Sequence, residues 1–258
     1  MKVISSRDNR HIKDCLKLKQ RKYRDAKGLF IIEGSIMLEE ALSFNKFAIQ
    51  QIFLTESLAN KLDLAELNSE IFLLNTRLMA EISETSTPQG VLAVVEKPVW
   101  SLENIKKESS LLVLLDRIAD PGNMGTIIRT ALALGVEGLL LTPACVDPFS
   151  PKVVRSSMGA IFNIPLLQNI TLSDINIFKE KGFKLVGTAL NNAAIYYEYD
   201  YNNPSIIVIG NEAHGLSEEL VHKCDKLVKI PINPIVDSLN AGVACGIILS
   251  EAWKQKHG

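Results

Sequence analysis

The sequence predicts an α/β protein with two domains. Short apolar runs typical of strands alternate with helical patterns along the whole chain of 258 residues. In the second half, runs such as those at 111–115 and 205–209 show no apolar–polar alternation, which is typical of parallel strands covered on both faces. A polar, proline-containing stretch separates the two regular regions. We therefore expect a domain at 1–95, a linker at 96–109 and a domain at 110–258.

The elements of the first domain follow from its apolar pattern. A basic helix is expected over 9–28, with a buried stripe formed by Ile12, Cys15, Leu16 and Leu18. Gly34 marks a turn between a short strand and a helix within 29–44. The other expected elements are strands at 48–56, 70–75 and 90–98 and helices at 58–67 and 76–84.

The second domain alternates strands and helices more regularly. Strands are expected at 111–116, 136–143, 183–190, 205–212 and 226–232. Helices are expected at 123–134, 150–159, 217–224 and 239–256. This pattern by itself predicts an open, doubly wound parallel sheet flanked by helices.

Composition excludes several classes of protein. The charged start and the lack of an apolar run near the ~20 residues of a membrane span lead us to expect a cytoplasmic protein without membrane association. The cysteines have no zinc or redox spacing, and the histidines are scattered, so we expect reduced thiols and no metal. The cysteines are Cys15, Cys145, Cys224 and Cys245.

Charge is distributed unevenly along the chain. Residues 1–27 hold ten basic and three acidic side chains, an excess of seven positive charges, whereas the remainder is acidic. A basic front end on an acidic body favours contact with phosphate, as in nucleic-acid binding. The alternative is a solvated surface helix.

The chain lacks the common nucleotide and hydrolase motifs. No G-x-G-x-x-G follows a strand, and neither a P-loop nor a G-x-S-x-G elbow occurs. Three loops remain as candidate sites, and each of them follows a predicted strand of the second domain. In the first, "DRIADPGNMGTIIRTALALG", Arg129 lies off the apolar stripe of its helix. A surface ion pair is the alternative role for Arg129.

The other two loops are rich in small residues. In "VIGNEAHGLSEEL", Gly210 permits a close backbone approach, and Glu212 has no evident packing role. An exposed acid in a tight connection is the alternative. In "IPINPIVDSLNAGVACG", a run of small residues opens a helix, which is expected where something packs very close. Packing against the sheet alone is the alternative there.

Taken in this order, the loops resemble the three motifs of the SpoU (TrmH-type) family of RNA ribose methyltransferases, within the SPOUT superfamily. The matching stretches are "NMGTIIRTA", "GNEAHGLS" and "IPI…DSLNAGVA", and the likeness runs from Leu111 to the C-terminus. Ala241 and Gly242 depart from it, because the family commonly has larger residues there. The front half is similar to a ribosomal-protein-like RNA substrate-binding domain. The resemblance implies a deep trefoil knot in the C-terminal domain, an exception to the usual unknotted topology.

The resemblance also implies the chemistry. The cofactor is expected to be S-adenosylmethionine, held by Thr188, Ala189, Leu190, Gly210, Ile230 and Leu239. The catalytic set is expected to be Arg129, Asn123, Glu212, Ser238 and Asn240. We expect Arg129 to hold the target phosphate and stabilise the developing oxyanion, oriented by Asn123 and Glu212. Ser238 and Asn240 are expected to position the ribose.

The expected substrate is RNA, in particular 23S ribosomal RNA methylated on a ribose 2′-hydroxyl. Phosphate contacts are expected from Arg7, Lys17, Lys19, Arg21, Lys22, Arg24 and Arg155. A homodimer through the C-terminal domain is expected from the family. A tRNA 2′-O-methyltransferase and a non-catalytic RNA-binding or ribosome-assembly protein of the same fold are the alternatives, and a nucleotide-dependent oxidoreductase lacks its fingerprint.

Overall fold

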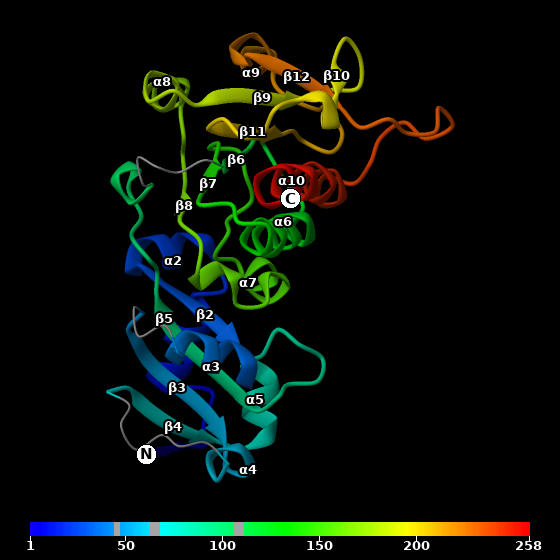
Figure 1. Ribbon diagram of the computed structural model, residues 1–258. Coiled ribbons are helices and arrows are strands. Elements are labelled where there is room, and N and C mark those ends of the chain that lie inside the picture. The colour runs from blue at the N-terminus through cyan, green and yellow to red at the C-terminus, as the bar shows by residue number, and fades with distance from the viewer. Residues whose placement is uncertain (44–46, 62–67, 106–110) are drawn as a thin grey trace. The chain divides into compact units, whose positions relative to one another are not determined.

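The computed structural model describes residues 1–258 apart from 44–46, 62–67 and 106–110 (Figure 1). Parts of the expected helix at 58–67 and of the expected linker at 96–109 therefore lie outside the described residues. The chain forms two compact units. Unit 1 contains residues 1–99 and 147–162, and unit 2 contains residues 100–146 and 163–258. The segment 147–162 thus folds with the N-terminal residues, although the sequence pattern places it in the second domain.

Unit 1 is built on a mixed five-stranded sheet in the order β1-β4-β3-β5-β2. β1, β4 and β3 run parallel, whereas β5 is antiparallel to both β3 and β2. The strand bounds are β1 (Lys2–Ile4), β2 (Leu29–Glu33), β3 (Ile49–Thr55), β4 (Glu70–Leu74) and β5 (Val91–Glu96). The sequence pattern does not predict β1, because a strand of three residues with a single buried side chain carries no periodic signal.

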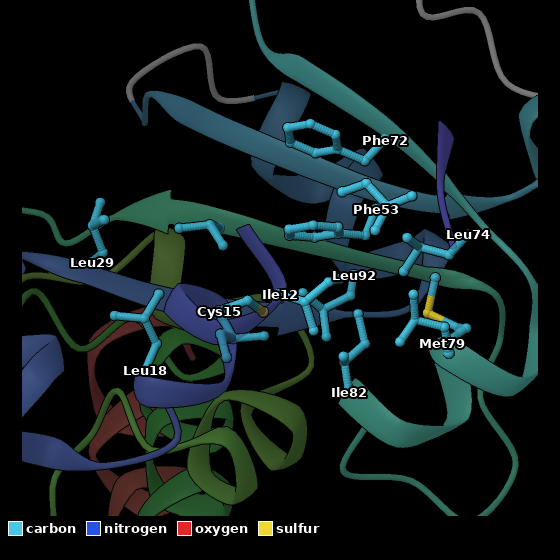
Figure 2. Close-up of a cluster of buried hydrophobic side chains, with 14 residues drawn as sticks. Ile12, Cys15, Leu18, Leu29, Phe53, Phe72, Leu74, Met79, Ile82 and Leu92 are labelled. Carbon is cyan, nitrogen blue, oxygen red and sulfur yellow. The ribbon is translucent and has the colours of Figure 1, made fainter. Parts of the chain in front are cut away.

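The expected basic helix is in fact two helices. α1 (Arg10–Lys17) is followed by the C-cap residue Leu18, and α2 (Arg21–Lys27) is followed by the C-cap residue Gly28, whose φ of 64° suits glycine. Ile12, Cys15 and Leu18 are buried against the sheet, as the stripe predicts, while Leu16 is only partly buried. α5 (Thr76–Ile82) contributes to the same core (Figure 2). α4 (Glu56–Ala59) is a single short turn beside β3.

The opposite face of this sheet is covered by two segments far apart in sequence. α3 (Ser35–Ser43) and α7 (Pro151–Ser157) both contact β2, and a short 3-10 helix, η2 (Ala160–Phe162), follows α7. The ring of Phe30 in β2 lies 5.2 Å from that of Phe149 and 6.1 Å from that of Phe162. Residues 147–162 therefore complete the core of unit 1 and cover its edge strand.

Arg24 corrects one prediction. Its place in the basic run predicts a phosphate-binding residue, but its side chain is only 3% exposed. Its Nε and Nη2 donate to Oδ2 of Asp147 at 2.8 and 2.6 Å, and its Nη1 donates to the carbonyls of Leu18 and Lys19 at 2.7 and 2.8 Å. The guanidinium is thus engaged in a buried ion pair within unit 1, and it is not available to phosphate.

Unit 2 has the parallel sheet that the sequence predicts. Its seven strands, all parallel to their neighbours, follow the order β10-β12-β9-β11-β6-β7-β8. The bounds are β6 (Leu111–Leu115), β7 (Leu139–Leu141), β8 (Leu166–Leu167), β9 (Lys184–Thr188), β10 (Ala194–Ile195), β11 (Ser205–Ile209) and β12 (Lys226–Lys229). β8 and β10 are not predicted from the sequence, because two residues make no recognisable pattern.

Helices cover both faces of this sheet. α8 (Leu172–Glu180), which the sequence pattern does not predict, and α9 (Glu218–Lys223) bury side chains against one face. α6 (Pro121–Ala133) and α10 (Ala241–His257) lie side by side, with α10 also contacting β11 (Figure 1). Short 3-10 helices occur at η1 (Leu102–Asn104) and η3 (Tyr196–Glu198). Among the described residues, none of the helices could cross a membrane.

The small residues of α10 allow it to approach α6 closely. A Cβ added at Gly242 would lie 3.1 Å from Cγ2 of Thr126 and 3.2 Å from Oδ1 of Asn240. A Cβ added at Gly246 would lie 3.5 Å from Cγ2 of Thr130, an ordinary contact distance. A methyl group at position 242 would therefore meet a tight contact, whereas one at position 246 would not.

This difference makes a testable prediction. Gly246→Ala is expected to stabilise the protein by about 1 kcal/mol, because alanine has the higher helix propensity. Gly242→Ala is expected to give no such gain, because its methyl group displaces Thr126 or the Asn240 side chain. Thermal melts of the two variants check this, with a rise of roughly 2–4 °C for Gly246→Ala alone. An equal rise in both would contradict the packing argument.

Candidate active site

A cavity of about 510 Å³ lies at the carboxyl ends of β9, β11 and β12. These three strands end at Thr188, Ile209 and Lys229, and they follow one another in the sheet with β9 in the middle. Ligands of parallel sheets bind at this edge, where the loops that follow the strands diverge. The first turns of α10 close the cavity through Ala241, Ala244 and Ile248.

The structure brings all the predicted cofactor residues to this cavity. They come from the end of β9 and from the loops after β9, β11 and β12, and all of them line the cavity: Thr188, Ala189, Leu190, Gly210, Ile230 and Leu239. Apolar side chains make up much of the remaining lining, and the volume falls within the range of small-molecule sites. Their role as cofactor ligands remains a prediction.

The loop after β11 is folded tightly onto itself. Asn211 and Gly215 exchange backbone hydrogen bonds of 3.0 and 2.9 Å, and Oδ1 of Asn211 accepts from the N–H groups of Ala213 and His214. A Cβ added at Gly210 would lie 2.4 Å from the carbonyl carbon of Gly215. The close approach inferred for Gly210 is therefore an approach to the protein's own loop, which any larger residue would open.

A chain of polar side chains connects the three motif loops. Nδ2 of Asn123, in the first turn of α6, donates to Oε1 of Glu212 at 2.6 Å. Nδ2 of Asn240 donates to Oδ1 of Asn123 at 2.7 Å. Since an ionised carboxylate only accepts, the bond to Glu212 fixes which way the Asn123 amide points. Asn240 then uses its own Oδ1 to cap α10, accepting from the N–H groups of Gly242 and Val243.

Two other predicted catalytic residues, Ser238 and Arg129, take no part in these hydrogen bonds. Ser238 is exposed and lines the cavity. Arg129 is exposed on α6, six residues after Asn123, and does not line the cavity. Within the described part of the chain, Arg129 has no hydrogen-bond or ion-pair partner, so the surface ion pair proposed as its alternative role is not observed. Asn123 and Glu212 bond one another, and their expected role in orienting Arg129 remains a prediction.

Two thiols of unit 2 are held in the protonated form by burial. Complete burial raises the pKa of Cys245, in α10, to about 12. Burial likewise raises the pKa of Cys224, at the end of α9, to about 11. Both thiols are thus protonated at neutral pH and poor nucleophiles. Across the described ranges, no three His, Cys, Asp or Glu side chains gather as a metal site requires.

A second hollow, of about 590 Å³, lies at the opposite, amino-terminal ends of the same strands. Lys184 and Lys226, which begin β9 and β12, line it together with Glu198 and Asp200. It contains none of the residues selected from the sequence, and its charges are of both signs. We therefore place the candidate site in the cavity at the carboxyl ends.

The predicted phosphate-binding residues of unit 1 lie mostly at its surface beside acids. The ion-pair distances are Arg7–Glu81 3.9 Å, Lys17–Asp14 3.1 Å, Lys19–Glu84 2.9 Å and Arg21–Asp25 3.4 Å. Nζ of Lys22 lies 4.8 Å from the ring centroid of Tyr23, and Arg155 is exposed on α7. A phosphate that binds here must compete with the neighbouring carboxylates for these side chains. Since exposed ion pairs are weak, the side chains can still bind phosphate.

Some residues of the site are not predicted from the sequence. Asn211, Ile232 and Asp237 line the cavity, and so do Ala241, Ala244 and Ile248. The last three recur at the spacing of one helix face, a signal visible in the sequence. Asp116, which the sequence also does not single out, does not line the cavity; it is 2% exposed directly after β6, and its Oδ2 accepts the N–H of Ser217 at 2.8 Å.

Comparison with known proteins identifies the family of both halves. The SpoU rRNA Methylase family matches residues 110–250, and the MRM3-like substrate binding domain matches residues 9–93. The chain is 34% identical to the 23S rRNA (guanosine(2553)-2′-O)-methyltransferase RlmP of Bacillus subtilis, over 96% of this chain and 98% of that protein. It is 37% identical to a 23S rRNA (uridine(2479)-2′-O)-methyltransferase of Streptomyces viridochromogenes, over 69% and 65% of the two chains.

Solved structures support the same family assignment. An AdoMet-bound rRNA methyltransferase from Sinorhizobium meliloti superposes with a TM-score of 0.91 and 33% identity, over 100% of this chain and 99% of that one. The SpoU methyltransferase AviRb from Streptomyces viridochromogenes, in complex with AdoMet, gives a TM-score of 0.89 and 30% identity over 96% and 98%. With the family model matching more than half of the chain and these relatives nearly all of it, the protein belongs to the SpoU rRNA methylase family.

Proposed function

We propose that this protein uses S-adenosylmethionine to methylate a ribose 2′-hydroxyl in 23S ribosomal RNA. The observation that carries the proposal is the convergence of the three motif loops, joined by the Asn123–Glu212 and Asn240–Asn123 hydrogen bonds, at one cavity. The relatives named for 2′-O-methylation of 23S rRNA support the choice of substrate.

The cavity fits the proposed cofactor. Its lining combines residues of the loops after the three strands with many apolar side chains, which suits the adenosine group and the methionine chain of the donor. Thr188, Ala189 and Leu190 would hold the adenine side, and Gly210, Ile230 and Leu239 the remainder. When bound, the sulfonium supplies an electrophilic methyl group.

The predicted catalytic residues would hold the RNA so that its 2′-oxygen can attack the methyl group. Arg129, exposed and unpaired in the described structure, would bind the target phosphate and stabilise negative charge forming on the 2′-oxygen. A guanidinium stays protonated in proteins, so Arg129 acts as a cation and not as a base. Ser238 and Asn240 would position the ribose. The Asn123–Glu212 hydrogen bond would hold the loop after β11 against the start of α6.

Unit 1 would dock the RNA through phosphates. Replacement of Lys17, Lys19, Arg21 and Lys22 by glutamine is expected to reduce the slope of log affinity against log salt, by roughly 0.7–0.9 for each phosphate that the variant no longer neutralises. Filter binding to ribosomal RNA at several salt concentrations measures the slope. The charge-conserving set Lys17→Arg, Lys19→Arg, Arg21→Lys and Lys22→Arg serves as the control. An unchanged slope in the glutamine variant would remove this segment from RNA binding.

We further propose that the protein is a cytoplasmic homodimer whose C-terminal unit carries the interface and the trefoil knot. The exposed Val243 and Trp253 of α10 support an apolar contact there. Light scattering after gel filtration tests the dimer, and a monomer at micromolar concentration would contradict it.

The experiment that tests the proposed function is transfer of tritiated methyl groups from S-adenosylmethionine to purified RNA, followed by mapping of the labelled nucleotide. Label on a ribose of 23S ribosomal RNA is the expected result. Label in tRNA would favour a tRNA methyltransferase instead. RNA binding without label on either RNA would favour a non-catalytic, ribosome-assembly role.

A further inference from the structure

Arg117 has an unusual backbone conformation directly beside the candidate site. It follows β6 and the buried Asp116, and its φ of 57° lies in the left-handed region. A bulky L-residue rarely adopts this conformation, and it persists only where the surroundings impose it. Such outliers gather at functional sites, so the contacts that hold Arg117 need an explanation.

Both the backbone and the side chain of Arg117 are engaged. Its N–H donates to Oγ1 of Thr142 at 3.0 Å, and its carbonyl accepts from Nδ2 of Asn211 at 2.8 Å. Its Nη2 donates to the carbonyl of Gly215 at 3.2 Å, and its Nε donates to Oδ2 of Asp116 at 3.2 Å. The left-handed backbone directs the N–H and the carbonyl toward different loops.

These contacts attach both ends of one short loop. Asn211 and Gly215 are the two residues that close the loop 211–215 by mutual backbone hydrogen bonds. Glu212 lies within that loop and accepts the hydrogen bond from Asn123. Arg117 does not line the cavity, so any effect on the ligand must pass through the loop.

We propose that Arg117 is a positioning residue that holds the loop 211–215, and with it Glu212, in the geometry needed for methyl transfer. The proposal rests on the proposed function of this site. Arg117 lies outside the cavity and holds the loop through two hydrogen bonds. With its backbone in the left-handed conformation, its carbonyl bonds Asn211 at one end of the loop while its guanidinium bonds Gly215 at the other.

Three variants separate the side chain from the backbone. Arg117→Gly loses the guanidinium but adopts φ of 57° freely, so it keeps the backbone bonds to Thr142 and Asn211. Arg117→Ala also loses the guanidinium, but alanine still has a Cβ and is strained at a φ of 57°. Fewer interactions remain in this variant to hold the backbone in that conformation. Arg117→Lys keeps the charge but not the fork geometry. Arg77→Ala, at an exposed arginine of unit 1, is the matched control for removal of one positive charge.

Calorimetry with S-adenosylmethionine and single-turnover methyl transfer are the measurements. For Arg117→Gly we expect a decrease of about five- to tenfold in donor affinity, the size of one or two net hydrogen bonds. Arg117→Ala is expected to lose more, Arg117→Lys less, and Arg77→Ala nothing. Wild-type values in both Arg117→Gly and Arg117→Ala would overturn the proposal.

A double-mutant cycle with Glu212→Gln provides a readout that a general stabilising role would not affect. If Arg117 acts through the loop, the decreases in single-turnover rate from Arg117→Ala and Glu212→Gln are less than additive. Full additivity would overturn the proposal. Wild-type protein that neither binds the donor nor methylates RNA would instead refute the proposed function, so the two failures are distinguishable.

Discussion

Arg129→Ala is expected to lower the rate of methyl transfer by about 10²- to 10³-fold, the usual loss when one donor to a developing oxyanion is removed. The 2′-hydroxyl is a weak acid, and its oxygen gains negative charge as its proton leaves, before the bond to the methyl carbon is complete. Arg129 is exposed on α6 and has no hydrogen-bond or ion-pair partner among the described residues, so its guanidinium is available to RNA. Single-turnover transfer with saturating RNA measures the effect on chemistry.

Two controls sharpen this prediction. The affinity for S-adenosylmethionine is expected to be unchanged in Arg129→Ala, because Arg129 does not line the cavity. Arg129→Lys is expected to fall between wild type and alanine, since it keeps a charge but loses the two-pronged geometry that matches phosphate. Near-wild-type transfer by Arg129→Ala, with unchanged RNA binding, would refute the assigned role.

Arg24→Met is expected to destabilise unit 1 by about 3–5 kcal/mol, the cost of leaving one partner of a buried ion pair uncompensated. The substitution leaves the carboxylate of Asp147 buried beside apolar side chains, and it removes the donors to the carbonyls of Leu18 and Lys19. Urea unfolding followed by circular dichroism gives the change in free energy.

Arg21, on the same helix as Arg24, provides a matched control for the loss of an arginine in an exposed ion pair. Arg21→Met removes an exposed pair with Asp25, on the same helix, and is expected to cost at most about 1 kcal/mol. The double variant Arg24→Met/Asp147→Leu is expected to recover part of the stability, because no buried charge remains. Equal destabilisation by Arg24→Met and Arg21→Met would show that the buried pair contributes little.

The same ion pair explains one limit of prediction from sequence. Arg24 lies in a run of basic residues that looks solvated, and only its contact with Asp147, 123 residues away, reveals that it is buried. The assignment of 147–162 to unit 1 could not be predicted for the same reason. From the sequence alone, Phe149 and Phe162 could belong to the core of either half, and only their contacts with Phe30 decide it. Local pattern does not specify which core an apolar side chain joins.

The parallel sheet and its strand-end loops were predictable because buried strands and the glycines after them leave local signals. Gly210 and the small residues of α10 are recognisable in this way, and the structure shows their close contacts. The hydrogen bonds that join Asn123, Glu212 and Asn240 were not predictable, because they depend on how three distant loops meet. Arg117 has no signal of its own, since its left-handed backbone is visible only in three dimensions.

A crystal structure of this protein with S-adenosylmethionine tests the central claim most directly. We expect the donor in the cavity at the carboxyl ends of β9, β11 and β12, against Thr188, Gly210 and Leu239, with its methyl group directed toward the side of Arg129. A donor bound elsewhere, such as in the hollow beside Lys184 and Lys226, would contradict the account.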